Sequence, residues 1–327
     1  MFKSLVQYCS IPVLLLSATL APAAQLSTDA RGAIPHDVQQ LVVVDYRAMQ
    51  NSGTAMNLKS KVEPPELKQF DEALNKFMLA KTPSGGGGEP IDHYVDQLAF
   101  ALFRPSPTSD ALQSVGVAQG QFPTQEILAS FRAQKLRATL LRSNSIYPMT
   151  KTGMVLCFVD PSTMIFGGKD AVIKALDARD GLGSSMLTNN AMMDAMQSVD
   201  SEPLWSILDN KGTQTMMKQL LGEAGSVTDF DSVKARLESS WYSMNFSHGV
   251  RFDLTIQTGD TFAAATVSSL LSAAVMLRKM TGSDTEKQAL NATSIDSNSG
   301  KLEVHFASSD SDFSALLQSP LFQNVVH

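Results

Sequence analysis

The sequence predicts an α+β protein made of two similar units, each an antiparallel or mixed sheet with helices packed on one face. Short apolar or alternating segments recur along the chain, separated by stretches whose apolar residues have helical spacing. The predicted order of elements, strand, helix, strand, strand, helix, strand, strand, helix, occurs twice. The 327 residues, 43% hydrophobic and 18% charged, have the composition of a globular protein of one large or two small domains.

The first predicted unit spans residues 35–182 and opens with a strand at Gln40–Tyr46. Its sequence, QLVVVDY, contains an unbroken β-branched run, which is typical of a strand buried on both faces. A helix is predicted from Pro65 to Leu79, because Leu67, Phe70, Leu74, Phe77 and Met78 recur at helical spacing. The other predicted elements are strands at 97–103, 115–119, 137–141, 154–159 and 163–166, and helices at 124–135 and after Gly168.

A connecting helix is predicted within residues 183–200, and the second unit spans residues 201–327. The segment Arg251–Gln257 alternates apolar and polar residues, as a strand with one solvated face does. A long helix is predicted from Thr261 to Met280. The other predicted elements are strands at 204–209, 241–246, 292–296 and 302–307, and helices at 213–221, 229–238 and 312–317.

The first 23 residues have the three parts of a secretory signal peptide. Lys3 provides the positive region, Ile11–Leu20 the apolar core, and Ala21-Pro22-Ala23 the cleavage motif. Because the apolar core has about half the length of a membrane-spanning helix, we predict cleavage after Ala23 and no permanent membrane anchor. The mature protein is then expected in the periplasm or outside the cell, beginning with a polar arm at residues 24–34.

Charge and cysteine content argue against a nucleic-acid-binding protein and against a fold stabilised by disulfides. A net charge of −6 without a cluster of Lys or Arg argues against a nucleic-acid partner. Cys9 lies within the signal peptide, and Cys157 lies in the apolar run Met154–Val159, where a thiol behaves as a small hydrophobe. The fold is therefore expected to depend on packing, without disulfides.

No catalytic or cofactor signature is found in the sequence. The five histidines are far apart, and no H-x-x-x-H pair places two of them on one helix face for zinc. Neither G-x-S-x-G nor S-x-x-K occurs, and Ser184-Ser185 lacks the glycine that should follow a nucleophile. We therefore expect a non-catalytic binding or interaction protein without a cofactor, with a protein, peptide or lipid as its partner. The alternative is an enzyme of unrecognised type, such as a hydrolase assembled from dispersed residues.

Methionines are concentrated in the middle of the chain, and Met192, Met193 and Met196 admit three interpretations. Their thioethers are soft ligands, so one hypothesis is a copper(I) site. A second hypothesis is an adaptable groove for a peptide or lipid. In the third, the three side chains form an ordinary apolar stripe on a buried helix.

Short motifs from about Pro35 to Phe322 resemble a family of secreted bacterial proteins of unknown function. The resemblance is carried by Ile34-Pro35-x-Asp37, by Met164–Gly168 with the following helix Ala171–Asp177, and by Pro203-Leu204-Trp205. It implies a fold of two α+β units and export from the cytoplasm. It implies no activity and no catalytic residue.

Overall fold

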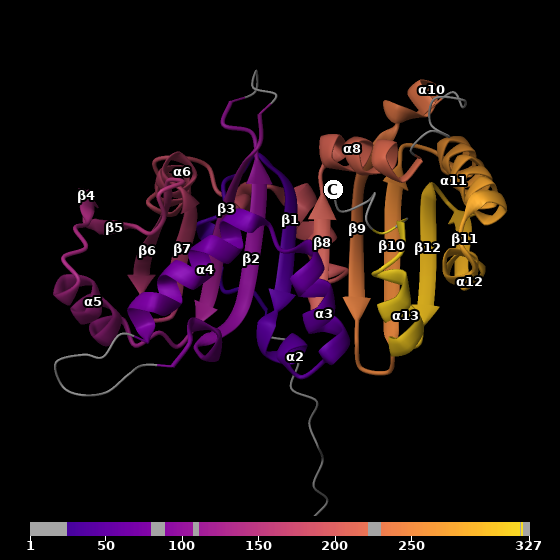
Figure 1. Ribbon diagram of the computed structural model, residues 1–327. Coiled ribbons are helices and arrows are strands. Elements are labelled where there is room, and N and C mark those ends of the chain that lie inside the picture. Colours follow the sequence, from indigo (N-terminus) through magenta and orange to yellow (C-terminus); the bar gives the residue numbers. More distant parts are fainter. Residues whose placement is uncertain (1–24, 80–88, 107–110, 222–229, 321, 323–327) are drawn as a thin grey trace, which may run out of the picture.

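The computed structural model describes residues 25–79, 89–106, 111–221, 230–320 and 322. The predicted signal peptide and its cleavage site at Ala23 lie outside these residues, so they stay predictions. The described chain forms one mixed α+β structure around a single antiparallel sheet of 12 strands (Figure 1). The α+β class predicted from the sequence is confirmed.

The first half contributes the larger number of strands. They are β1 (Val38–Asp45), β2 (Val95–Phe103), β3 (Gln113–Gly120), β4 (Thr139–Leu141), β5 (Asn144–Pro148), β6 (Met154–Asp160) and β7 (Thr163–Gly168). The helices of this half are α1 (Thr28–Gly32), α2 (Tyr46–Gln50), α3 (Gly53–Val62), α4 (Pro65–Met78), the 3-10 turn η1 (Ile91–His93), α5 (Thr124–Ala133) and α6 (Lys169–Arg179).

The 3-10 turn η2 (Met186–Thr188) and α7 (Asn190–Gln197) lead into the second half. Asn189 caps α7, its side chain accepting a hydrogen bond from the Met192 amide at 3.2 Å. The strands of this half are β8 (Leu204–Leu208), β9 (Leu237–Asn245), β10 (Val250–Thr258), β11 (Thr293–Asn298) and β12 (Lys301–Ser308). Its helices include α8 (Asn210–Leu221), α10 (Phe230–Lys234), α11 (Thr261–Thr281), α12 (Asp284–Asn291) and α13 (Asp310–Leu316).

The two halves meet at the centre of the sheet, where β1 pairs with β8. The complete strand order is β11-β12-β10-β9-β8-β1-β2-β3-β7-β6-β5-β4. Outward from the centre, the first half begins β1-β2-β3-β7-β6 and the second runs β8-β9-β10-β12-β11. The hydrogen-bonded ladder between β1 and β8 makes one continuous sheet of both halves. The internal repeat itself stays a prediction, which superposition of the two halves would test.

One face of the sheet is tightly covered in the first half. Leu41 and Val43 of β1, with Trp205 and Ile207 of β8, are buried on this face. They belong to a core that also contains residues of α1, α6 and α7. In the second half the same face is polar: His305 pairs with Asp253 at 2.7 Å and has half its side chain exposed, as predicted for a solvated strand face.

The opposite face carries helices along both halves. Figure 1 shows α3, α4 and α13 in front of the sheet. Phe70 and Leu74 of α4 pack there with Phe131 of α5, while Val267 and Leu271 of α11 pack with the second-half strands. The first half thus has helices on both of its faces. This is because β1 and β2 are apolar on both sides.

Several elements differ from the sequence predictions. The segment predicted as a polar arm contains α1, and Leu26 and Ala30 are buried in the core. Isolated apolar residues between polar ones produced no periodic signal there. Strand β5 and the helices α2, α3 and α12 were also not predicted, since each is short or has few apolar residues. Helix α5 begins at Thr124, so Pro123 occupies the cap position and no side-chain cap forms.

Glycine at position 116 is required by the packing of an aromatic ring. A Cβ at Gly116 on β3 would lie 2.2 Å from the nearest ring atom of Phe166 on the paired strand β7. We predict that Gly116→Ala lowers the free energy of unfolding by about 1–3 kcal/mol, because the ring must move within a packed face. Urea denaturation measures this. Gly53→Ala, at a helical position with open space around it, should be neutral or slightly stabilising, and equal losses in both variants would contradict the argument.

Candidate functional site

A cavity of about 590 Å³ lies between the sheet and the helices α3 and α4. Its floor is formed by side chains that project from one face of β1, β2 and β3 and by residues of β7, with Leu204 of β8 at one side. Val42 and Val44 of β1 and Leu98, Phe100 and Leu102 of β2 are only partly buried, although they lie near the centre of the sheet. The cavity is therefore the place where the apolar face of the sheet is incompletely covered.

The shape of the cavity follows from the corner between α3 and α4. Pro64 disfavours a helical conformation at Glu63, which has an extended ψ of 120° and ends α3. Pro65 occupies the first position of α4, where its missing amide hydrogen costs nothing. The two helices therefore leave the corner in different directions, and neither one covers the floor between them.

The two helices are also held by different parts of the protein. On α3, the Thr54 hydroxyl donates a hydrogen bond of 2.5 Å to Asp310 of α13, and Leu58 packs with Phe313 of α13. On α4, the ring of Phe70 stacks on Phe166 of β7, with 4.8 Å between centroids. One wall of the cavity is thus attached to the second half of the chain and the other to the first half.

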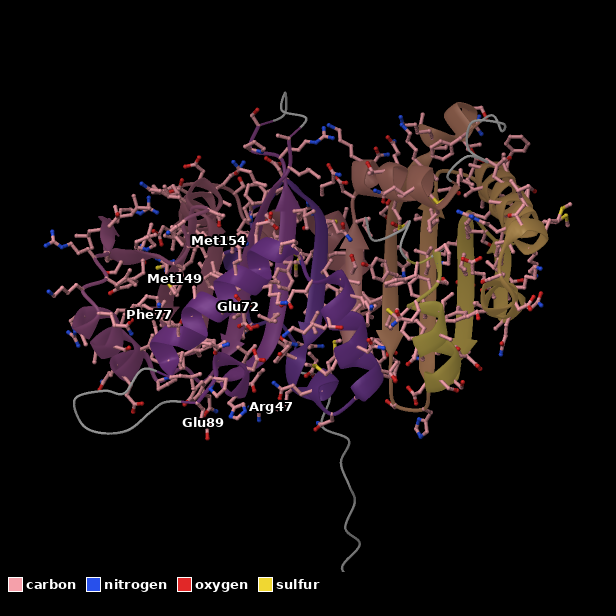
Figure 2. The ribbon with its side chains drawn as sticks, viewed as in Figure 1. Arg47, Glu72, Phe77, Glu89, Met149 and Met154 are labelled. Carbon is pink, nitrogen blue, oxygen red and sulfur yellow. The ribbon has the colours of Figure 1, made fainter. Side chains whose placement is uncertain are left out.

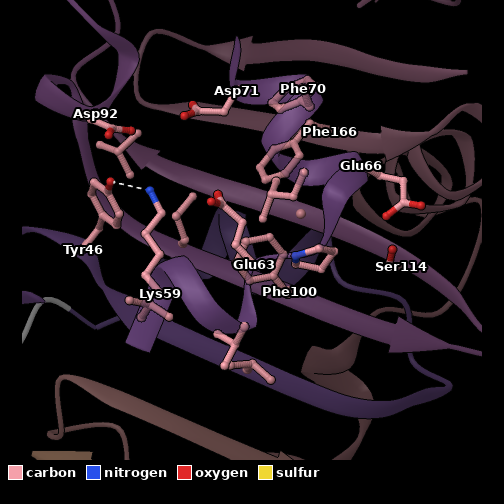
Figure 3. A pocket seen from close by; sticks show the side chains of 18 of the residues that line it. Tyr46, Lys59, Glu63, Glu66, Phe70, Asp71, Asp92, Phe100, Ser114 and Phe166 are labelled. Carbon is pink, nitrogen blue, oxygen red and sulfur yellow. Dashed lines mark hydrogen bonds between the residues drawn. The ribbon is translucent and has the colours of Figure 1, made fainter. Parts of the chain in front are cut away.

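The walls are mainly aliphatic and aromatic. Phe166 also contacts Phe100 edge-on, with 6.0 Å between centroids, so Phe70, Phe166 and Phe100 form one aromatic cluster (Figure 3). Four methionines contribute flexible thioethers to the lining: Met49, Met56, Met154 and Met164. Such side chains adapt to ligands of different shape.

Polar side chains gather at one end of the cavity, which we call the mouth: Tyr46, Lys59, Glu63, Asp71 and Asp92 (Figure 3). Lys59 Nζ donates a hydrogen bond of 2.8 Å to the Tyr46 hydroxyl and lies 4.8 Å from the centre of its ring. Burial is the main cause that raises the pKa of Tyr46 to about 12. At neutral pH the pair is therefore a neutral phenol bound to an ammonium.

Asp71 has the most unusual acid–base behaviour of the mouth. Burial, followed by the nearby charge of Asp92, raises the pKa of its carboxyl to about 6. Lys59 opposes this shift, and Glu63 and Glu72 add to it. Glu72, the next residue on α4, is exposed (Figure 2). The structure thus keeps a carboxylate partly desolvated beside other acidic groups.

No catalytic constellation is formed in the described part of this cavity. Ser114 lines it beside Glu66, at the opposite end from Tyr46 and Lys59 (Figure 3). Nucleophilic catalysis needs a nucleophile, a base and an orienting group within hydrogen-bond reach. An apolar middle separates these two polar ends of the cavity.

A second, polar hollow contains Ser184, His36 and Asp37. His36 Nδ1 lies 3.1 Å from Asp37, but both side chains are substantially exposed. Ser184 is exposed, and its hydroxyl forms no hydrogen bond with another described residue. Within the described ranges there is also no group of three or more His, Cys, Asp or Glu side chains that could hold a metal ion.

The three methionines singled out in the sequence lie away from the cavity. Met192 and Met196 of α7 are buried in the core on the opposite face of the sheet, and Met193 packs against that core. This placement favours the packing interpretation. Sequence reasoning missed the methionines that do line the cavity, because they come from separate helices and strands.

Comparisons with known proteins identify the fold and no family. No protein-family model matches this chain, and no curated protein does. Crystal form I of TP0453 is similar to it with a TM-score of 0.51 and 11% identity, covering 90% of this chain and 98% of that one. Crystal form III gives 0.50 and 13% identity, covering 89% and 98%. Such identities concern the fold alone, so the family resemblance seen in the sequence stays a prediction.

One described helix, α11, is long and apolar enough to cross a membrane by length and composition. Of its most apolar window, 22% is buried, and its Val267 and Leu271 belong to the core. Phe262, Met276 and Met280 are exposed on its outer side. A core helix can pass the same test, so this observation does not assign α11 to a membrane.

The packing interpretation of the three methionines is testable by substitution. We predict that Met192→Leu, Met193→Leu and Met196→Leu each change the free energy of unfolding by less than about 1.5 kcal/mol, because volume is nearly conserved. Chemical denaturation gives these values. In parallel, copper(I) titration should show equal, weak binding by the wild type and the triple variant; binding lost only in the variant would restore the copper hypothesis.

The raised pKa of Asp71 predicts a pH dependence of stability. The group holds its proton up to about pH 6 in the folded protein but ionises near its ordinary value of 3.8 when unfolded. Its favourable contribution to the free energy of unfolding is therefore complete below about pH 4 and is lost as the pH rises through about 6. Asp71→Asn should raise the melting temperature at about pH 7.5 and leave it unchanged at about pH 4.

Glu72→Gln is the matched control, because it removes the same charge from an exposed position on the same helix. Its effect on the melting temperature should be small at both pH values. A stabilisation by Asp71→Asn that is the same at both pH values would refute the assignment.

Proposed function

We propose that this protein binds the apolar chain of a lipid or similar amphiphile in the cavity beneath α3 and α4. The observation that carries the proposal is the cavity itself, which has about 590 Å³ and apolar walls in the middle of the sheet. This volume lies within the range of roughly 300–1,000 Å³ that is typical of small-molecule sites. Burial of an alkyl chain there contributes about 0.8 kcal/mol for each methylene group.

The lining favours an alkyl chain over a peptide. Each peptide unit brings an N–H and a C=O group that need hydrogen-bond partners once buried. The side chains around the middle of the cavity, such as Val44, Leu98 and Phe100, offer none. An alkyl chain has no such requirement, and its polar head can remain at the mouth.

Export fits this proposal. The N-terminal signal predicted from the sequence would deliver the protein to a compartment where a carrier shields an alkyl chain from water. An enzymatic role would require a reactive group at the mouth, and Lys59 is already bonded to Tyr46 there. Binding without catalysis is thus the function that the arrangement of side chains supports best.

Chain length provides a first test of the proposal. We expect affinity to increase by roughly tenfold for each pair of added methylenes from octanol to decanol to dodecanol, until the chain outgrows the cavity. Isothermal titration calorimetry on the mature protein, below the concentration at which each alcohol aggregates, measures this. Absence of binding by all three alcohols would reject the proposal.

Filling the cavity provides the second test. Val44→Trp places an indole over the floor and should abolish alcohol binding without unfolding the protein, because the ring enters empty space. Val44→Ile adds one methylene at the same position and should bind within about threefold of the wild type, since it leaves most of the volume free. Equal binding by wild type and a folded Val44→Trp protein would place the ligand elsewhere.

A further inference from the structure

The charged side chains that line the cavity are strongly unbalanced. Among the described residues, they comprise the carboxylates of Glu63, Glu66, Asp71 and Asp92 and the ammonium of Lys59. All except Glu66 lie at the mouth. A ligand head placed there would therefore meet a negative environment that is partly shielded from water.

The ammonium of Lys59 is already engaged. Lys59 Nζ donates to the Tyr46 hydroxyl and lies over the Tyr46 ring. Tyr46 is buried and follows β1 directly, which fixes this pair at the end of the central strand. An anionic head would have to compete with Tyr46 for Lys59 and would approach three carboxylates.

Two of the carboxylates, those of Glu63 and Asp71, are in contrast available. Neither Glu63 nor Asp71 forms a hydrogen bond or ion pair with another described residue, and both are only partly exposed. They project from the corner and from α4 toward the same mouth (Figure 3). A positively charged group between them would supply the missing partner for both.

We propose that the ligand is a cationic amphiphile whose ammonium head lies at the mouth between Glu63, Asp71 and Asp92. This inference rests on the proposed binding of an alkyl chain and adds the charge of the head group. Opposite charges attract across a partly desolvated mouth, whereas a carboxylate or phosphate head is repelled. The mouth thereby selects among amphiphiles with the same chain.

The same geometry couples binding to protonation. The charged groups around Asp71 are Asp92 on η1, Lys59 on α3, Glu63 at the corner and Glu72 on α4. A bound ammonium favours the ionised form of Asp71, so binding releases a proton where that carboxyl is protonated beforehand. Affinity for the ammonium ligand should therefore rise with pH through about 6, while affinity for a neutral ligand should not.

Three ligands with the same chain test the proposal: decylammonium, decanol and decanoate. Their affinities are measured by calorimetric titration of the mature protein at about pH 8 and about pH 5. At about pH 8, affinity should decrease in the order given. We expect decylammonium to bind about fivefold more tightly than decanol, the size expected for a partly exposed charge pair. This preference should shrink at the lower pH.

Neutralisation of the mouth identifies the residues responsible. The double variant Glu63→Gln/Asp71→Asn should lose the preference for decylammonium and the pH dependence, yet bind decanol like the wild type. His93, which contacts Glu89, is retained in the double variant, so any contribution from it would persist there. Glu126→Gln removes one carboxylate from the exposed surface of α5 and should change nothing.

The outcomes separate the two proposals. If decanol binds but decanoate binds as tightly as decylammonium, the ammonium head is rejected and the cavity remains the binding site. A preference for decylammonium that survives the double variant would reject the mouth as its origin. If none of the three ligands binds, the proposed function fails as well.

Discussion

The structure depends on one constraint: the central strand β1 is apolar on both faces. Leu41 and Val43 point to one side and Val42 and Val44 to the other, so both faces of the sheet centre must be covered. The first pair is covered completely by the core around α1, α6 and α7. The second pair is covered by α3 and α4 only in part, and the apolar area left between these helices is the cavity.

The cavity is a junction between the two halves of the chain. Its floor is continuous from β3 across β1 to β8, while α3 is attached to α13 and α4 to β7. Because these attachments involve different core clusters, the width between the helices depends on how the halves are held together by the β1–β8 ladder.

Much of the fold could be predicted from the sequence. The helix Pro65–Met78 and the strand around Leu254 have strong periodicity, and the strands around Phe100 and Cys157 are apolar runs. All four lie close to their predicted positions. The short elements α1, α2 and β5 were not predicted, since their structure is stabilised by distant contacts such as those of Leu26 with the core. The cavity was not predicted for the same reason. Its lining comes from separate helices and strands, and no local pattern connects Tyr46 with Asp71 or Met164.

The sequence by itself determined the α+β class, the alternation that leaves one face of β10 and β12 polar, and the apolar character of β1 on both faces. These properties are local, because they follow from side-chain periodicity along single segments. Only the tertiary structure decided that one apolar face of β1 is buried in a core while the other borders a cavity. The pairing of β1 with β8 and the divergence of α3 from α4 at Pro64 set that difference, and both depend on contacts between residues far apart in the chain.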